Sequence, residues 1–165
     1  MAIEVREVRP KEHAEAGEVA ADSYREFAQA GGADWQEYLE RLADVEGRTA
    51  LATVLVAIED GRIVGTVTLE LDGRIDDDHG TLALHEAHIR MLAVHPDARR
   101  RGIGPLLMAA SEERARTAGR TLVTLNTTDR MEAAQRMYES LGYARGEDKR
   151  ISEDFVLLSY SKRLV

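Results

Sequence analysis

The sequence has no cysteine among its 165 residues. Disulfide bonds, thiolate catalysis and cysteine-ligated zinc are therefore excluded. It also has no apolar run that approaches the roughly 18 residues of a membrane-spanning helix. Its first six residues, Met1 to Arg6, lack the basic and apolar regions typical of a signal peptide. We therefore expect a cytoplasmic protein that makes no contact with a membrane.

An excess of positive charge is missing as well. Lys and Arg number 22 against 30 Asp and Glu, which gives a formal net charge of −8. Broad contact with nucleic-acid phosphates needs the opposite balance, so we expect no nucleic-acid partner. The chain is long enough for one domain with a real core and short for two. We therefore expect a single domain over residues 1–165.

Hydrophobic periodicity predicts strands and helices along the chain. Strands are expected at residues 3–8, 53–58, 62–71, 87–94, 121–125, around 143 and at 155–160. Helices are expected at residues 11–30, from a capping Asp34 to Val45, at 102–118 and around 134–141. Asp60-Gly61 is a strong turn signal inside a hairpin, and Gly119 is a helix stop. Alternating strands and helices, with hairpins at either end, predict a mixed α/β sheet.

One stretch, residues 89–108, organises the rest of the chain. It starts as an apolar strand that His95-Pro96-Asp97 ends, because proline has no N–H for a strand ladder. Three arginines and Gly102-Ile103-Gly104 follow, and then a helical pattern begins. The first N–H groups of a helix have no intrahelical acceptor and carry partial positive charge, and glycine lets the backbone approach an anion closely. The stretch therefore predicts a phosphate-binding turn.

Two common phosphate-binding motifs do not fit this stretch. A P-loop needs four residues between its glycines and then a lysine, whereas one residue separates Gly102 from Gly104 and no lysine follows. A dinucleotide-binding fingerprint needs a third glycine where Leu107 stands. What remains is the pattern Arg99-x-x-Gly102-x-Gly104 between a strand and an amphipathic helix.

This pattern resembles the acetyl-CoA-binding motif of the GNAT N-acetyltransferase superfamily. A second segment, with Asn126, Ala134, Tyr138 and Gly142-Tyr143, resembles the later motif of the same superfamily. The two motifs cover about residues 88–143. The resemblance implies the GNAT acyl-CoA N-acyltransferase fold, an α/β fold with a mostly antiparallel twisted sheet of six to seven strands and about four flanking helices.

The resemblance also implies that acetyl-CoA is the co-substrate, that no metal is used, and that the acetyl group passes directly to a primary amine of a small molecule or protein. A splay beside the strand would let its main chain pair with the pantetheine amides, and the turn would hold the pyrophosphate. The implied cofactor-binding residues are Leu92, Ala93, Val94, Arg99, Arg100, Arg101, Gly102, Ile103, Gly104 and Asn126. The alternative for the arginines is a solvated basic turn.

Catalytic roles follow from the same resemblance. Tyr138 matches the tyrosine that acts as general acid in many members; alternatively it is a buried packing residue. Asn126 contacts the cofactor or caps a helix. The identity of the general base is left open. His88 lies at the position where one branch of the superfamily has its base glutamate. Glu86, on the same face of the strand, could instead hold a water that acts as the base.

Several partners and functions stay open. Four clustered aromatic residues either pack two helices on the sheet or, as the resemblance implies, line the acceptor site: Tyr24, Phe27, Trp35 and Tyr38. The cluster at residues 76–79 is interpreted as a solvated loop; folded over the site, it would favour a cationic amine. Homodimers are common among similar proteins. The rival functions are a catalytically silent acyl-CoA-binding regulatory module and an aminoacyl-tRNA acetylating toxin, which the net charge disfavours.

Overall fold

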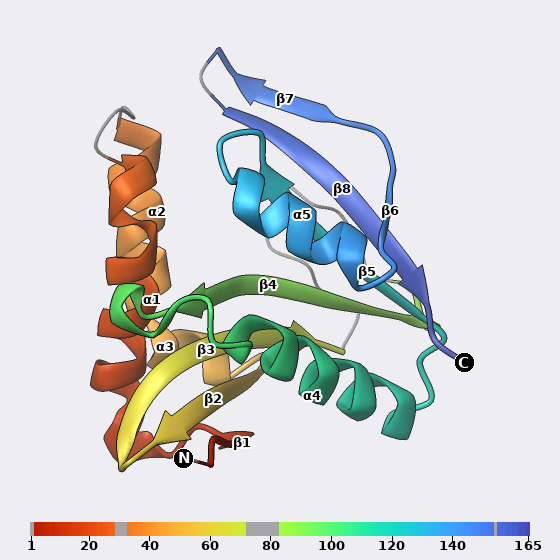
Figure 1. Ribbon diagram of the computed structural model, residues 1–165. Coiled ribbons are helices and arrows are strands. Elements are labelled where there is room, and N and C mark those ends of the chain that lie inside the picture. The colour runs from red at the N-terminus through yellow and green to blue at the C-terminus, as the bar shows by residue number, and fades with distance from the viewer. Residues whose placement is uncertain (1, 29–32, 72–82, 154) are drawn as a thin grey trace.

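The computed structural model describes residues 2–28, 33–71, 83–153 and 155–165, and these form one eight-stranded sheet with helices on both faces (Figure 1). The strands are β1 (Glu4–Glu7), β2 (Thr53–Glu59), β3 (Arg62–Glu70), β4 (Glu86–Val94), β5 (Leu122–Thr128), β6 (Ala144–Arg145), β7 (Lys149–Ser152) and β8 (Phe155–Arg163). Their order is β1-β2-β3-β4-β5-β8-β6, with β7 also paired to β8. Among these pairs, β4 and β5 run parallel and the others are antiparallel.

The helices are α1 (His13–Ala28), α2 (Ala33–Ala43), α3 (Val45–Thr49), α4 (Ile103–Thr117) and α5 (Glu132–Ser140), with short 3-10 turns at Pro10–Glu12 and Pro96–Ala98. α4 and α5 cover one face of the sheet and share its main core, which includes Leu107, Met108, Tyr138 and Leu158. α1, α2 and α3 cover the other face through smaller clusters around Val19 and Leu42. Figure 1 shows α1 and α2 packed side by side, at the end of the sheet toward which the N-terminus of α4 lies.

Several local predictions are confirmed. Asp60 and Gly61 both have positive φ, 52° and 78°, which is the two-residue turn that a twisted hairpin favours. Gly119, with φ of 80°, follows the last turn of α4, and its N–H donates to the main-chain oxygen of Arg116. The mixed sheet is the expected fold class.

Other boundaries differ from the prediction. The expected second helix begins at Ala33, so Asp34 is not its cap, and it breaks at Asp44, whose carboxylate accepts from the N–H of Gly47 and starts α3. Two short helices therefore replace one. β7 is one strand more than expected. Asn126, for which capping of a helix was the alternative, instead lies in β5, which continues to Thr128 because β8 supplies ladder partners from Leu157 to Ser159.

The acidic cluster at residues 76–79 lies outside the described residues, so its interpretation stays a prediction. No helix in the described part of the chain is long and apolar enough to cross a membrane.

Candidate active site

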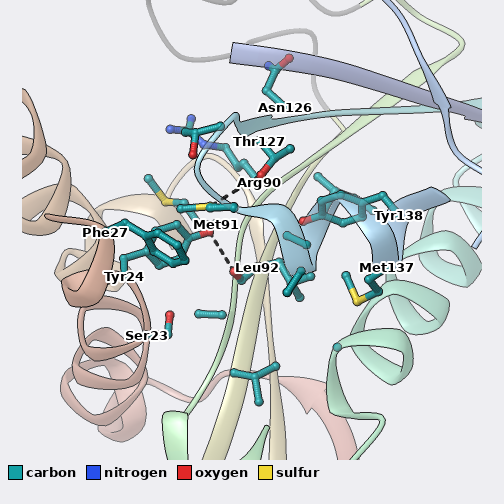
Figure 2. A pocket seen from close by; sticks show the side chains of 18 of the residues that line it. Ser23, Tyr24, Phe27, Arg90, Met91, Leu92, Asn126, Thr127, Met137 and Tyr138 are labelled. Carbon is teal, nitrogen blue, oxygen red and sulfur yellow. Dashed lines mark hydrogen bonds between the residues drawn. The ribbon is translucent and has the colours of Figure 1, made fainter. Parts of the chain in front are cut away.

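A cleft of about 1130 Å³ opens where β4 and β5 separate (Figure 2). The parallel pairing of these strands runs from Glu86–Leu122 to Ile89–Leu125 and then stops. Beyond Ile89, β4 continues to pair with β3 only. The cleft is walled by α1 and α2 on one side and by β5 and α5 on the other, with the turn before α4 at one end. This is the splay that the sequence analysis expected beside the strand.

A bulge in β4 shapes the floor of the cleft. Arg90 pairs with Thr68 and Ala93 pairs with Thr66, so β4 has one residue more than β3 over this span. Met91 takes a left-handed φ of 54°, which is unusual for a non-glycine residue. The bulge interrupts the β3–β4 ladder beside Met91 and Leu92, and both of these residues line the cleft.

Tyr24 holds this irregular backbone from the opposite wall. Its hydroxyl donates to the main-chain oxygen of Leu92 at 2.9 Å, as Figure 2 shows. Burial raises the pKa of Tyr24 well above its usual value, so the hydroxyl remains a donor at any physiological pH. Tyr24 is one of the four aromatic residues expected either to pack the helices or to line the acceptor site; it lines the cleft, and its contact with Leu92 was not predicted.

The turn between β4 and α4 has the features of an anion cradle. Arg100 and Gly102 adopt left-handed φ values of 64° and 79°, and a Cβ at Gly102 would meet nothing within 4 Å. No side chain caps α4, whose third residue is Pro105. The N–H groups of Ile103 and Gly104 therefore have no intrahelical acceptor, and both residues line the cleft.

The three arginines of this turn point to different places. Arg99 lines the cleft, but its guanidinium donates to the main-chain oxygen of Ser23 at 3.0 Å and pairs with Glu26, both on α1. Arg101 pairs with Glu59 at the β2–β3 hairpin and does not line the cleft. Arg100 is exposed, lines the cleft and makes no ion pair with any other described residue. The side chain of Arg101 thus points away from the cleft, and cofactor binding by the three arginines stays a prediction.

Gly104 has a second reason to be glycine. A Cβ there would lie 2.9 Å from the sulfur of Met137 on α5, so a side chain at this position would force the Met137 side chain to shift.

Tyr138 extends from α5 into the cleft, and its hydroxyl lies on the side toward β4 in Figure 2. The ring packs edge-on against Tyr143 and tilted against Tyr160, at centroid distances of 6.1 and 5.9 Å. Burial, with Tyr38 and Tyr160 nearby, raises its pKa above the ordinary tyrosine value. Tyr138 thus combines packing through its ring with a protonated hydroxyl at the cleft.

Asn126 lies on β5 at the edge of the cleft, where its side-chain oxygen accepts from the hydroxyl of Ser159 at 3.3 Å. It caps no helix, because the residue that precedes α5 is Met131. The capping alternative is therefore wrong.

His88 and Glu86 lie at different distances from the cleft. His88 is 3% exposed and lines it, and its Nδ1 lies 2.8 Å from the hydroxyl of Thr124 on β5. That hydroxyl in turn points to the main-chain oxygen of Ala87 at 3.4 Å. Which of Nδ1 and the Thr124 hydroxyl donates in this bond depends on the tautomer of the ring. Glu86 is not among the lining residues.

Comparison with known proteins connects this geometry to chemistry. Residues 18–143 match the sequence profile described as "Acetyltransferase (GNAT) family". S-(2-succino)cysteine N-acetyltransferase of Bacillus subtilis (strain 168) is 32% identical over 109 residues, which are 64% of this chain and 63% of that protein. Aminoalkylphosphonate N-acetyltransferase of Salmonella typhimurium is 35% identical over 92 residues, 53% of this chain and 54% of that protein. The chain thus matches less than two thirds of the length of these curated relatives.

Solved structures share the whole fold. The paia N-acetyltransferase of Thermoplasma acidophilum, solved in complex with coenzyme A, superimposes with a TM-score of 0.74 over 96% of this chain and 98% of that one. The sequence identity is 15%, so the likeness shows a common fold. Among the described residues, no three His, Asp or Glu side chains gather in a way that could hold a metal ion.

Proposed function

The chain belongs to the GNAT acetyltransferase family, and from that premise we propose that it transfers the acetyl group of acetyl-CoA to a primary amine. The observation that carries the proposal is one cleft that joins a stretch of β4 not paired with β5 to the uncapped N-terminus of α4. A linear co-substrate whose amide-containing arm leads to a pyrophosphate fits that arrangement. The curated relatives are named for acetylating a substituted cysteine and an aminoalkylphosphonate, which supports a small-molecule amine as acceptor.

Acetyl-CoA binds along β4 in this proposal. The N–H groups of Ile103 and Gly104 and the exposed guanidinium of Arg100 hold the pyrophosphate. The main chain of Leu92 and Val94 pairs with the pantetheine amides, with the Ala93 methyl against the arm. Arg99, Arg101 and Gly102 contribute through the backbone of the turn, and Asn126 contacts the arm at the cleft edge.

His88 serves as the general base. An alkylamine is almost fully protonated at neutral pH, since its reference pKa is about 10.4, and it must lose a proton before it attacks the thioester. The lone pair of His88 Nε2 accepts that proton, directly or through one water, while Thr124 holds the ring through Nδ1. Glu86 lies on the same strand but does not line the cleft, so it takes no direct part in this proton transfer.

Tyr138 stabilises the leaving thiolate. Sulfur becomes negative as the carbon–sulfur bond breaks, and a hydroxyl aimed at it lowers the energy of that state. Because burial raises the pKa of Tyr138, the hydroxyl stays protonated and remains a hydrogen-bond donor. The proton that the thiolate finally takes up comes from this hydroxyl, which recovers one from the nitrogen that becomes cationic when the amine attacks, or from solvent.

Thermal unfolding tests the binding half of the proposal. Acetyl-CoA at a hundred times its Kd should stabilise the folded chain by about 2.7 kcal/mol. Pantetheine, which lacks the pyrophosphate, should stabilise it much less at the same concentration. Equal shifts with both compounds would contradict the phosphate cradle.

A further inference from the structure

We propose that the acceptor amine carries an anionic group, a carboxylate or phosphonate, that binds Arg130 and the N-terminus of α5. The inference rests on the acetyl transfer proposed above and names the class of acceptor. Its site is distinct from the pyrophosphate cradle at α4 and is formed by the end of β5 and the turn into α5.

The N-terminus of α5 faces the cleft without a side-chain cap. Met131 occupies the capping position with φ −94° and ψ 65°, and its side chain makes no capping hydrogen bond. The first intrahelical bond runs from the N–H of Gln135 to the oxygen of Met131. The N–H groups of Glu132, Ala133 and Ala134 therefore lack intrahelical acceptors, and all three residues line the cleft.

Two side chains beside this helix end point to a ligand independently. Arg130 lines the cleft, is half-buried and makes no ion pair with any other described residue. Thr128 also lines the cleft and is 6% exposed, and its hydroxyl has no hydrogen-bond partner in the described part of the chain. A buried hydroxyl without a partner costs free energy, which an anion at the cleft wall would recover by accepting from it.

The position of this helix end separates it from the cofactor phosphates. Met137, toward the other end of α5, meets Gly104 at the phosphate cradle. Met131 instead packs against Ala28 of α1 and Trp35 of α2. The two methionines are six positions apart, which is about 9 Å along a helix. The anion would thus lie on the side of α1 and α2, away from the contact between Met137 and the cradle.

Other charged groups of the cleft do not replace Arg130. Arg90 pairs with Glu70 at 3.0 Å, and Arg41 lies over the ring of Tyr38 at 5.4 Å. Glu132, in the first turn of α5, is exposed and lines the cleft, so it competes with an anion for the helix end. Removal of Glu132 should consequently leave or improve the use of anionic acceptors.

The test compares charged and neutral acceptors in steady-state assays with saturating acetyl-CoA. 4-Aminobutanoate, 6-aminohexanoate and 3-aminopropylphosphonate are each paired with a neutral analogue: the two amides and 3-aminopropanol. The wild type should prefer the anionic member by about tenfold or more in kcat/KM. Arg130→Gln should abolish that preference with KM for acetyl-CoA unchanged. Arg136→Gln, an exposed position of α5 outside the cleft lining, should retain it.

Stabilisation of the coenzyme A complex gives a second readout that needs no turnover. The anionic amines should raise the unfolding temperature of this complex for the wild type and for Arg136→Gln, and not for Arg130→Gln. Equal use of charged and neutral amines, or a raised KM for acetyl-CoA in Arg130→Gln, overturns the inference while acetyl transfer stands. No turnover of any amine, together with no stabilisation by the anionic ones, overturns both.

Discussion

The hydroxyl of Tyr24 on α1 donates a hydrogen bond to the main-chain oxygen of Leu92 on β4, across 68 positions of sequence. The bond ties the wall that faces the acceptor to the bulged strand on which we place the pantetheine arm. A second tie runs from Arg99 to the main-chain oxygen of Ser23, one residue earlier on α1. The two halves of the proposed site are thus in direct contact.

Tyr24→Phe should destabilise the free protein by about 1 kcal/mol, because the Leu92 oxygen loses one hydrogen bond. A pantetheine N–H would occupy the same oxygen, so saturating acetyl-CoA should shrink the difference between variant and wild type. Chemical denaturation with and without acetyl-CoA measures both. An equal difference in the two conditions would place the pantetheine arm elsewhere.

Arg100 and Arg101 form a matched pair for the phosphate cradle. Arg100→Gln should raise the Kd of acetyl-CoA about three- to tenfold, with the larger effect at low salt, because an exposed charge that contacts phosphate is lost. Arg101→Gln should change the Kd little, since that guanidinium pairs with Glu59. Calorimetric titration checks both. A larger rise in Kd for Arg101→Gln than for Arg100→Gln would contradict the proposed contact between Arg100 and the pyrophosphate. Gly104→Glu is a poorer test, because its side chain would strike Met137.

Substitutions at His88 and Glu86 form a second matched pair, which tests the identity of the general base. If His88 accepts the amine proton, kcat/KM should rise with pH through a limb that His88 contributes, because its protonation at low pH removes the lone pair. His88→Gln should remove that limb and lower the rate about 10²-fold or more. Glu86→Gln should be nearly silent, because Glu86 does not line the cleft. A damaging Glu86→Gln beside a silent His88→Gln would assign the base to a water held by Glu86.

The proposed role of Tyr138 predicts an effect on kcat and a particular dependence of the rate on high pH. Tyr138→Phe keeps the ring packing and should lower kcat about 10²-fold or more, with acetyl-CoA affinity retained. Ionisation of the hydroxyl would end its donation, but its pKa is raised, so the wild-type rate should show no tyrosine-dependent loss below about pH 10. An alkaline loss near neutrality that disappears in Tyr138→Phe would contradict the assigned environment.

Features set by local chemistry could be predicted from the sequence. The Asp60-Gly61 turn and the Gly119 stop each depend on a few adjacent residues whose backbone geometry glycine permits. The strand, arginine-rich turn and helix of residues 89–108 were also predictable as a unit, because proline and glycine mark both of its boundaries.

Features set by distant partners could not be predicted. Asn126 looks like a helix cap but lies in a strand, because β8 pairs with it. Arg101 lies one residue from a cleft-lining glycine, yet it pairs with Glu59, 42 positions earlier. The Tyr24–Leu92 bond and the cleft-facing end of α5 likewise depend on packing between helices and strands that no local pattern encodes.

The most direct test of the central claim is thiol release from acetyl-CoA by the wild type, measured with and without a panel of primary amines that includes anionic ones. We predict release that depends on the amine, with equal formation of the N-acetyl product, and its reduction by about 10²-fold or more in Tyr138→Phe. Tight binding of acetyl-CoA with no amine-dependent release across the panel would contradict the account. The chain would then be an acyl-CoA-binding regulatory module.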